Sequence, residues 1–289
     1  MKNDPVSKSI AVAKKAIAKS ASKDITLPNW PDNKRGTPNS FLRSALFSAI
    51  QSKDRADLKR AILASQAGII VTYTGQQLNQ EDLSVWECIV HLAKKHPLGY
   101  ICEFTGYEIL KTLNLPTAGE HHKRLHDVII RLTACAVEIK HAGTTFFGSL
   151  ISSGVKNDET GHYTITLDKD IIKLYGKTEW TSVNWDQREK LKRKPLAQAL
   201  HGYYSSHKTP HPIKIETLQK FTGGRNKQAA GFKIKVQKAL EELVYVGFLK
   251  SYSIENNLVY VIKRNTTLET QNNDFRDTAT TLETSKQRL

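Results

Sequence analysis

The most regular alternation of hydrophobic and polar positions lies near the C-terminal end of the chain. Residues 213–221 repeat their apolar side chains at helical spacing and stop at the pair Gly223-Gly224, and a longer helical pattern starts at Arg225. The apolar face of this longer helix carries Phe232, Val236, Leu240 and Leu243. Residues 248–254 and 258–262 then alternate as two strands around an Asn-rich turn that favours positive φ. Helix, tight turn, helix and β-hairpin together predict a winged helix.

Similar periodicities run through the earlier part of the chain. They predict helices over residues 40–51, 80–95, 107–113, 118–134 and 185–206, and strands over residues 69–73, 137–141, 145–151 and 162–167. The order helix, short helix, longer helix, β-hairpin therefore occurs twice, around residues 79–151 and 185–262, although the side chains show no literal repeat. We therefore predict an α+β protein with two tandem winged-helix domains.

Composition divides the chain into four segments. Residues 1–26 contain mainly Lys, Ala and Ser, and residues 266–289 are rich in Thr, Asn and Gln, so both are expected to be disordered tails. Between them we predict an N-terminal winged-helix domain over residues 27–177 and a C-terminal one over residues 178–265. A length of 289 residues is typical of two domains.

The net charge limits the classes of partner. A charge of +15 at pH 7 favours a polyanion, and nucleic acid in particular. No stretch approaches 18 consecutive apolar residues, so a membrane partner is not predicted. The cysteines, Cys88, Cys102 and Cys135, are an odd number without close spacing, which indicates reduced core side chains and a cytoplasmic protein.

Basic and amide side chains make the longer C-terminal helix the candidate DNA-reading element. They are Arg225, Asn226, Lys227, Gln228 and Lys235. Arg and Lys can donate to guanine, while Asn and Gln can pair with adenine. Residues 213–240 contain seven Lys or Arg side chains against one Glu, although a solvated basic helix face has the same pattern.

Two further basic groups are predicted to contact the DNA backbone. They are Lys192, Arg193 and Lys194 before Pro195, and Lys123, Arg124 and Arg131 on the helix over residues 118–134. This last helix holds the recognition-helix position in the first copy. Its lower density of basic side chains predicts that the first domain supplies mainly backbone contacts, while the second reads bases.

The sequence does not assemble an enzyme site. Gly176-Lys177-Thr178 lacks the earlier glycine of a phosphate-binding loop. His122 and His126 have the spacing of metal ligands on a helix but no evident third ligand, so a solvated or phosphate-contacting histidine cluster is favoured. We expect no enzymatic activity, no cofactor and no metal.

Several segments carry a resemblance to one family. They are residues 27–32 (LPNWPD), 35–47 (RGTPNSFLRSALF), 82–87 (DLSVWE), 96–99 (HPLG), 193–197 (RKPLA) and 201–204 (HGYY). Together they resemble the TrfA family of plasmid replication initiators, and the likeness spans about residues 27–254.

The resemblance implies a bacterial, plasmid-encoded initiator that binds double-stranded DNA at repeated origin sites, called iterons. It also implies opening of an AT-rich region, recruitment of host proteins including the replicative helicase and initiator, and a homodimer in equilibrium with the active monomer, with the strands over residues 69–73 and 137–151 available to a partner. Residues 24–28 stand where family members can carry a sliding-clamp motif, which casts doubt on direct clamp contact. The alternatives are a winged-helix transcriptional regulator at an operator and, more remotely, a nicking or recombining enzyme.

Overall fold

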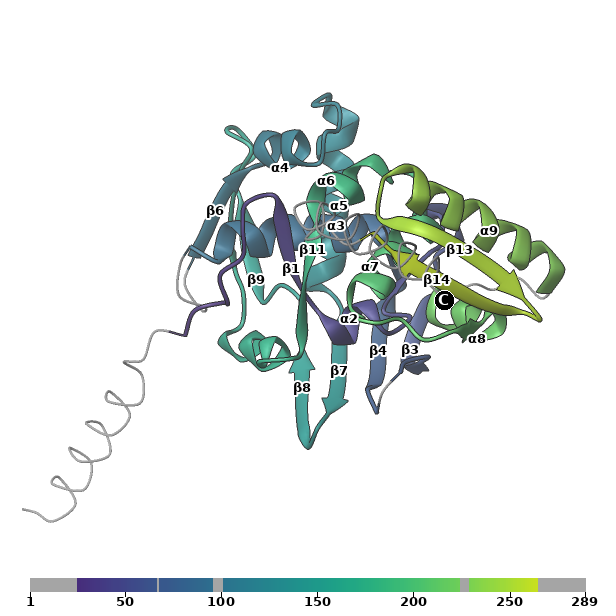
Figure 1. The fold of residues 1–289 in the computed structure, drawn as a ribbon. Coiled ribbons are helices and arrows are strands. Elements are labelled where there is room, and N and C mark those ends of the chain that lie inside the picture. Colours follow the sequence, from purple (N-terminus) through teal and green to yellow (C-terminus); the bar gives the residue numbers. More distant parts are fainter. Residues whose placement is uncertain (1–24, 67, 96–100, 224–228, 265–289) are drawn as a thin grey trace, which may run out of the picture.

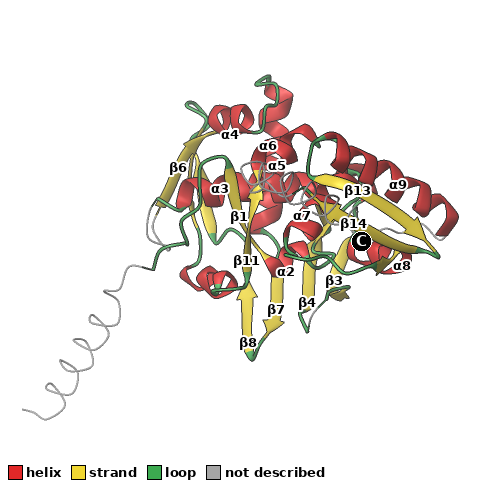
Figure 2. Cartoon of the chain, in the orientation of Figure 1, coloured by secondary structure: helices red, strands yellow, loops and turns green. Residues whose placement is uncertain are grey.

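The computed structural model describes residues 25–66, 68–95, 101–223 and 229–264. This part of the chain mixes helices with short strands (Figure 2). Its buried apolar side chains form two clusters, one from residues between Leu27 and Trp185 and one from residues between Leu191 and Val259. We call the parts that supply them the first half and the second half; the second half is green to yellow in Figure 1. The predicted tails fall almost entirely outside the described residues.

The first half is the larger of the two. Its helices are α2 (Asn39–Leu42), α3 (Gln80–Ala93), α4 (Gly106–Thr112) and α5 (Gly119–Thr133), with 3-10 helices at Ser52–Asp54 and Lys169–Tyr175. Its strands are β1 (Lys34–Pro38), β2 (Phe47–Ser48), β3 (Asp57–Leu63), β4 (Ile70–Gln76), β5 (Leu78–Asn79), β6 (Ile101–Thr105), β7 (Ala136–His141), β8 (Thr144–Gly148), β9 (Ser153–Lys156), β10 (His162–Thr166) and β11 (Trp180–Asn184).

The main sheet of the first half has the antiparallel order β3-β4-β7-β8. Val71, Ile139 and Phe146 lie side by side in register and are buried, because alternate residues of a strand point to the same face. On the opposite face Phe147 is 79% exposed. The strands expected to be open to a partner chain correspond to β4, β7 and β8. Strands β4 and β7 are interior, so among these three only β8 has a free edge in the described sheet.

Helix α3 begins with a capping box. The Asn79 side chain accepts hydrogen bonds from the backbone N–H groups of Glu81 and Asp82, and the Asp82 carboxylate accepts one from the Asn79 N–H. Asp82 is fully buried, and its charge is compensated by Arg55 at 2.6 Å and Arg131 at 3.1 Å. The helix predicted over residues 80–95 is therefore confirmed, and Asn79 is its N-cap.

The second half follows the predicted order of elements. They are α6 (Trp185–Lys190), α7 (Pro195–Ser205), β12 (Ile213–Lys214), α8 (Ile215–Phe221), α9 (Ala229–Tyr245), β13 (Leu249–Glu255) and β14 (Leu258–Lys263). Phe232, Val236, Leu240 and Leu243 of α9 are all buried, as predicted. The hairpin turns through Asn256 (φ 48°) and Asn257 (φ 62°), because Asn tolerates the left-handed region.

The two halves repeat an order of elements but not a sheet. The series α3, β6, α4, α5, β7, β8 in the first half corresponds to α7, β12, α8, α9, β13, β14 in the second. In the second half β12 joins the hairpin as its third strand, whereas β6 pairs with β10 in a separate sheet, β6-β10-β9. The predicted tandem order is confirmed, and the strand pairing within it differs.

Two predicted helices are wrong. Residues 40–51 form only the short α2, after which Phe47–Ser48 pairs in parallel with Leu78–Asn79. Phe41, Leu42, Leu46 and Phe47 are all buried, and an apolar run that is buried on every side has no periodicity to separate helix from strand.

The second wrong helix is the one predicted over residues 185–206. These residues break into α6 and α7, because Pro195 starts α7 and has no N–H to continue the earlier helix.

The residues that directly follow the predicted domain boundary belong to the first half. Strand β11 pairs antiparallel with β1, and Trp185 contributes to the first core. The change from one core to the other therefore falls between Trp185 and Leu191, later than the predicted boundary at residue 178.

A buried arginine joins the halves at that point. The Arg188 side chain of α6 has no exposed surface, and its Nε lies 2.8 Å from Oε2 of Glu87 in α3. The same guanidinium donates to the Gln80 carbonyl at 3.2 Å and to the Ser84 hydroxyl at 3.1 Å. Thr37 donates to the other Glu87 oxygen at 2.6 Å. These bonds hold α6 against α3.

Candidate nucleic-acid interface

The residues predicted to read bases fall mostly outside the described part of the chain. Arg225, Asn226, Lys227 and Gln228 lie in the stretch 224–228, so base reading by them stays a prediction. Lys235 is described and lies exposed on α9. Phe232 and Val236, on either side of it in sequence, are buried, so Lys235 is held facing outward by the packing of its neighbours.

An open groove of about 720 Å³ runs beside α9, and we call it the α9 groove. Its lining includes Lys235, Lys238 and Glu242 from α9, Lys194 and Pro195 from the start of α7, and Ile50 and Gln51 from the first half. Lys194 Nζ lies 2.5 Å from Glu242 Oε2, so one of the cations that line the α9 groove is already paired.

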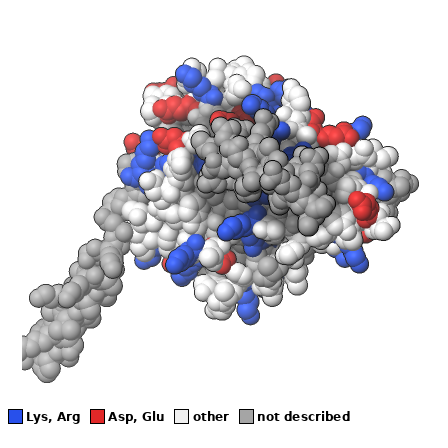
Figure 3. Space-filling model, viewed as in Figure 1, with Lys and Arg blue, Asp and Glu red and all other residues white. Residues whose placement is uncertain are grey.

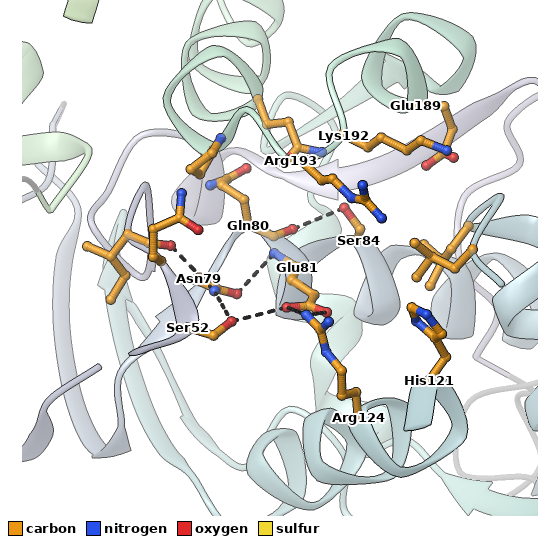
Figure 4. A pocket seen from close by; sticks show the side chains of 16 residues that line it. Ser52, Asn79, Gln80, Glu81, Ser84, His121, Arg124, Glu189, Lys192 and Arg193 are labelled. Atoms are coloured by element: carbon orange, nitrogen blue, oxygen red, sulfur yellow. Dashed lines mark hydrogen bonds and ion pairs between the residues drawn. The ribbon is translucent and has the colours of Figure 1, made fainter. Parts of the chain in front are cut away.

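A smaller pocket of about 180 Å³ lies next to this groove, between the two halves, and we call it the junction pocket. Its basic lining side chains are His121 and Arg124 from α5 and Lys192 and Arg193 from the turn between α6 and α7. Figure 4 shows Arg124 and Arg193 entering the pocket from opposite walls, with Ser52, Asn79 and Glu81 along one side.

The groove and the pocket adjoin each other, and we call the two together the depression. Ile50, Gln51 and Pro195 line both of them. Helix α5 therefore borders one end through Arg124, and α9 borders the other end through Lys235. These two helices hold corresponding places in the two halves, so a single elongated ligand along the depression can touch both.

Several of the predicted backbone contacts already have partners in the protein. Arg131 is 15% exposed at its side chain and binds Asp82 and the Gln76 side chain, at 3.1 and 2.8 Å. Arg124 lies 3.2 Å from Glu81, but half of its side chain is exposed. Lys192 donates to the Asn114 carbonyl at 2.9 Å. A DNA contact by Arg131 competes with the cap of α3 and stays a prediction.

Three of the predicted residues are unpaired in the part of the chain that the structure describes. Lys123, Arg193 and Lys235 are exposed and make no hydrogen bond or ion pair there. Charge alone does not locate the interface, because Lys and Arg side chains are scattered over the face shown in Figure 3, with acidic side chains between them. The candidate interface therefore consists of those basic side chains that line the depression.

Burial raises the pKa of one carboxyl group in the junction pocket. The Glu189 carboxylate at the end of α6 is largely desolvated, which raises its pKa to about 7; Lys192, Arg188 and Arg35 act in the opposite direction. Its Oε2 is buried and, within the described residues, has no hydrogen-bond partner. A carboxyl group that titrates near neutral pH therefore faces the cations of this pocket.

The sequence analysis missed the acidic and structural members of the site. Glu189 and Gln51 gave no pattern that distinguishes them from ordinary surface residues. Arg188 did carry a signal, since it stands three residues after Trp185 on the apolar side of its helix, where a charged residue needs a buried partner. Its partner Glu87 could not be found from spacing alone.

The weak chemical signals lie apart from this depression. His126 Nδ1 is 3.3 Å from the Tyr163 hydroxyl, and His122 packs beside Gly106. Among the described residues, no three His, Cys, Asp or Glu side chains are grouped so as to hold a metal ion. In the same residues, no helix is long and apolar enough to cross a membrane.

The fold and the depression define a class: an α+β protein of two related halves in which two corresponding helices line adjoining hollows that carry basic side chains. The sequence of residues 6–264 matches the model of the protein family described as TrfA protein. The chain therefore belongs to the TrfA family, as the resemblance predicted.

One relative and two solved structures extend the comparison. The plasmid replication initiator protein TrfA of Escherichia coli is 27% identical over 239 residues, covering 80% of this chain and 62% of the relative. This chain thus spans less than two thirds of that relative's length.

The structural likeness covers most of the chain. Domains 2 and 3 of RctB superpose with a TM-score of 0.53 at 11% identity, over 78% of this chain and 98% of theirs. The Pi initiator protein in complex with iteron DNA also superposes with a TM-score of 0.53 at 11% identity, over 82% of this chain and 100% of the Pi chain. At this identity the likeness concerns the fold.

Proposed function

We propose that this protein is a plasmid replication initiator that binds iteron repeats in double-stranded DNA at its origin. The observation that carries this proposal is that α5 and α9 line two adjoining hollows that carry basic side chains and share Ile50, Gln51 and Pro195. Membership of the TrfA family supports it, and so does the likeness in fold to an initiator solved with iteron DNA.

In this proposal each half is a winged helix. Helix α9 takes the recognition position in the second half, after the short α8, with β13 and β14 as the wing. Helix α5 takes the same position in the first half. The second half reads bases through residues 225–228 and Lys235, and the first half supplies mainly contacts to phosphates.

The further steps of initiation are part of the same proposal. Bound protein opens an AT-rich region and recruits the host helicase and initiator, without enzymatic activity, in the bacterial cytoplasm. The dimer in equilibrium with the active monomer forms through the first half, where β8 has a free edge and an exposed Phe147.

Footprinting of the purified chain on its own plasmid tests the proposal. We expect protection of several direct repeats beside an AT-rich tract. Protection of a single palindrome at a promoter would instead identify a transcriptional regulator. Divalent-metal-dependent nicking of supercoiled plasmid would contradict the non-enzymatic role.

A further inference from the structure

The turn between α6 and α7 carries an arginine in an unfavourable backbone conformation. Arg193 has φ of 63°, the left-handed region that residues with a side chain adopt at a cost. Glycine or asparagine is the usual residue at such a position. The Arg193 side chain is exposed and makes no hydrogen bond or ion pair within the described residues, so its guanidinium is available to a ligand.

Two arginine side chains from different halves line the junction pocket. Arg193 comes from the second half and Arg124 from α5 in the first half, and both side chains extend toward the space between them (Figure 4). Arg124 is steadied by Glu81 at 3.2 Å, while half of its side chain remains exposed. Two planar guanidinium groups facing one small opening form a favourable arrangement for an oxyanion with several acceptor oxygens.

An ionised Glu189 carboxylate opposes the binding of an oxyanion in the junction pocket. Its Oε2 is buried without a partner among the described residues, and the pocket lining holds Arg124, Lys192 and Arg193 against Glu81 and Glu189. The formal charge of this lining, with His121 neutral, is therefore +1 when Glu189 is ionised and +2 when it is protonated. A protonated carboxyl can also donate a hydrogen bond to an incoming anion.

We propose that the junction pocket binds one phosphate of the DNA backbone between Arg124 and Arg193, and that Glu189 must be protonated for this phosphate to enter. The phosphate belongs to the stretch of duplex between the parts that α5 and α9 contact, so it ties the orientation of the halves to DNA binding. This inference rests on the proposed DNA-binding function and assigns to it a specific site and a pH response.

The charged groups around Glu189 set the sign of that response. They are Arg188 on its own helix, Lys192 and Arg193 in the following turn, Arg35 on β1, Glu87 and Glu81 on α3, and His121 and Arg124 on α5. Since burial raises the pKa of Glu189 to about 7, the phosphate-accepting form falls from about half of the molecules at pH 7 to about one tenth at pH 8. DNA affinity should therefore weaken with rising pH, because only the competent fraction binds.

The first experiment measures the salt dependence of iteron binding by the full-length protein at pH 6.5. Arg193→Asn removes the guanidinium and keeps a residue that tolerates positive φ, so the fold should be at least as stable. We expect the slope of log affinity against log salt to fall by about one unit. Lys190→Gln, which removes one exposed charge nearby but outside the pocket lining, should leave the slope unchanged. Equal slopes for the two variants would overturn the proposal.

The second experiment tests Glu189 by comparing pH 6.5 with pH 8. Glu189→Gln should bind iteron DNA up to about tenfold tighter than the wild type at pH 8 and about equally at pH 6.5. His121→Gln is the comparison variant, because it replaces the one histidine in the lining of the pocket. If His121→Gln removes the pH dependence and Glu189→Gln does not, the assignment to Glu189 is wrong.

A third measurement separates DNA phosphate from free phosphate. Because the two arginines suit any phosphate oxyanion, inorganic phosphate at constant ionic strength should raise the melting temperature of the DNA-free wild type slightly more than that of Arg193→Asn, while the salt slope on DNA also separates the two proteins. A larger rise for the wild type, together with unchanged salt slopes on DNA, would mean that the pocket serves a free anion and would overturn the DNA assignment. Absence of any iteron preference in the wild type would instead refute the proposed function itself.

Discussion

The contact between Arg188 and Glu87 gives the most direct test of how the halves are held together. Both side chains have no exposed surface, and their charged atoms lie 2.8 Å apart. Replacing Arg188 by Met removes the cation and leaves the Glu87 carboxylate buried, with the Thr37 hydroxyl as its remaining hydrogen-bond donor among the described residues. Breaking a buried ion pair on one side costs about 3–5 kcal/mol. That is a large part of the 5–15 kcal/mol by which domains are usually stable.

Urea unfolding of the full-length protein measures this loss. All four tryptophans lie in the first half or at its boundary, so fluorescence reports the core that contains Glu87, while far-UV circular dichroism reports both halves. With a dependence of about 2–3 kcal/mol per molar urea, Arg188→Met should lower the fluorescence midpoint by roughly 1–2.5 M.

Two comparisons keep this prediction specific. Glu87→Gln combined with Arg188→Met removes both charges and should recover part of the loss, giving a measurable coupling energy. Arg124→Met breaks a pair whose side chains are 53% and 33% exposed, and should cost only about 0–1 kcal/mol. If Arg188→Met is no more destabilising than Arg124→Met, the buried pair does not hold the halves as inferred.

Four further outcomes are expected. Gln228→Ala should cost about 1–3 kcal/mol on the specific site and much less on random DNA, measured by competition binding; equal losses would limit it to phosphate contact. Inserting five base pairs between the two half-contacts, about half a helical turn, should remove the affinity added by the first half, and unchanged affinity would refute docking by both halves. Phe147→Lys, at the free edge of β8, should weaken dimerisation in sedimentation more than Ile62→Lys on β3, whose pairing with β4 is irregular. Because burial raises the pKa of Glu189 to about 7 from 4.5, the folded protein loses stability as pH rises through this range, and thermal unfolding of Glu189→Gln should show less of that loss.

Sequence periodicity was sufficient where one face of an element is solvated. Helix α9 shows this, since Phe232, Val236, Leu240 and Leu243 are buried while Lys235 is exposed. The Asn256-Asn257 turn and the Asn79 cap were equally predictable, because local backbone chemistry decides both. The repeated order of elements and the choice of a polyanionic partner followed from the same local information and from the net charge.

Tertiary structure decided what depends on contacts between distant residues. The segment over residues 40–51 is buried on every side, so packing against Leu78–Asn79 and not periodicity made part of it a strand. Likewise β11 joined the first half by pairing with β1, about 145 residues earlier in the chain. The junction pocket brings together α5 and the turn before α7, and the protonation of Glu189 within it depends on burial. Burial and long-range pairing are properties of the folded chain, which is why the sequence supplied the basic side chains of the site but not the arrangement that places Arg124, Arg193 and Glu189 around one opening.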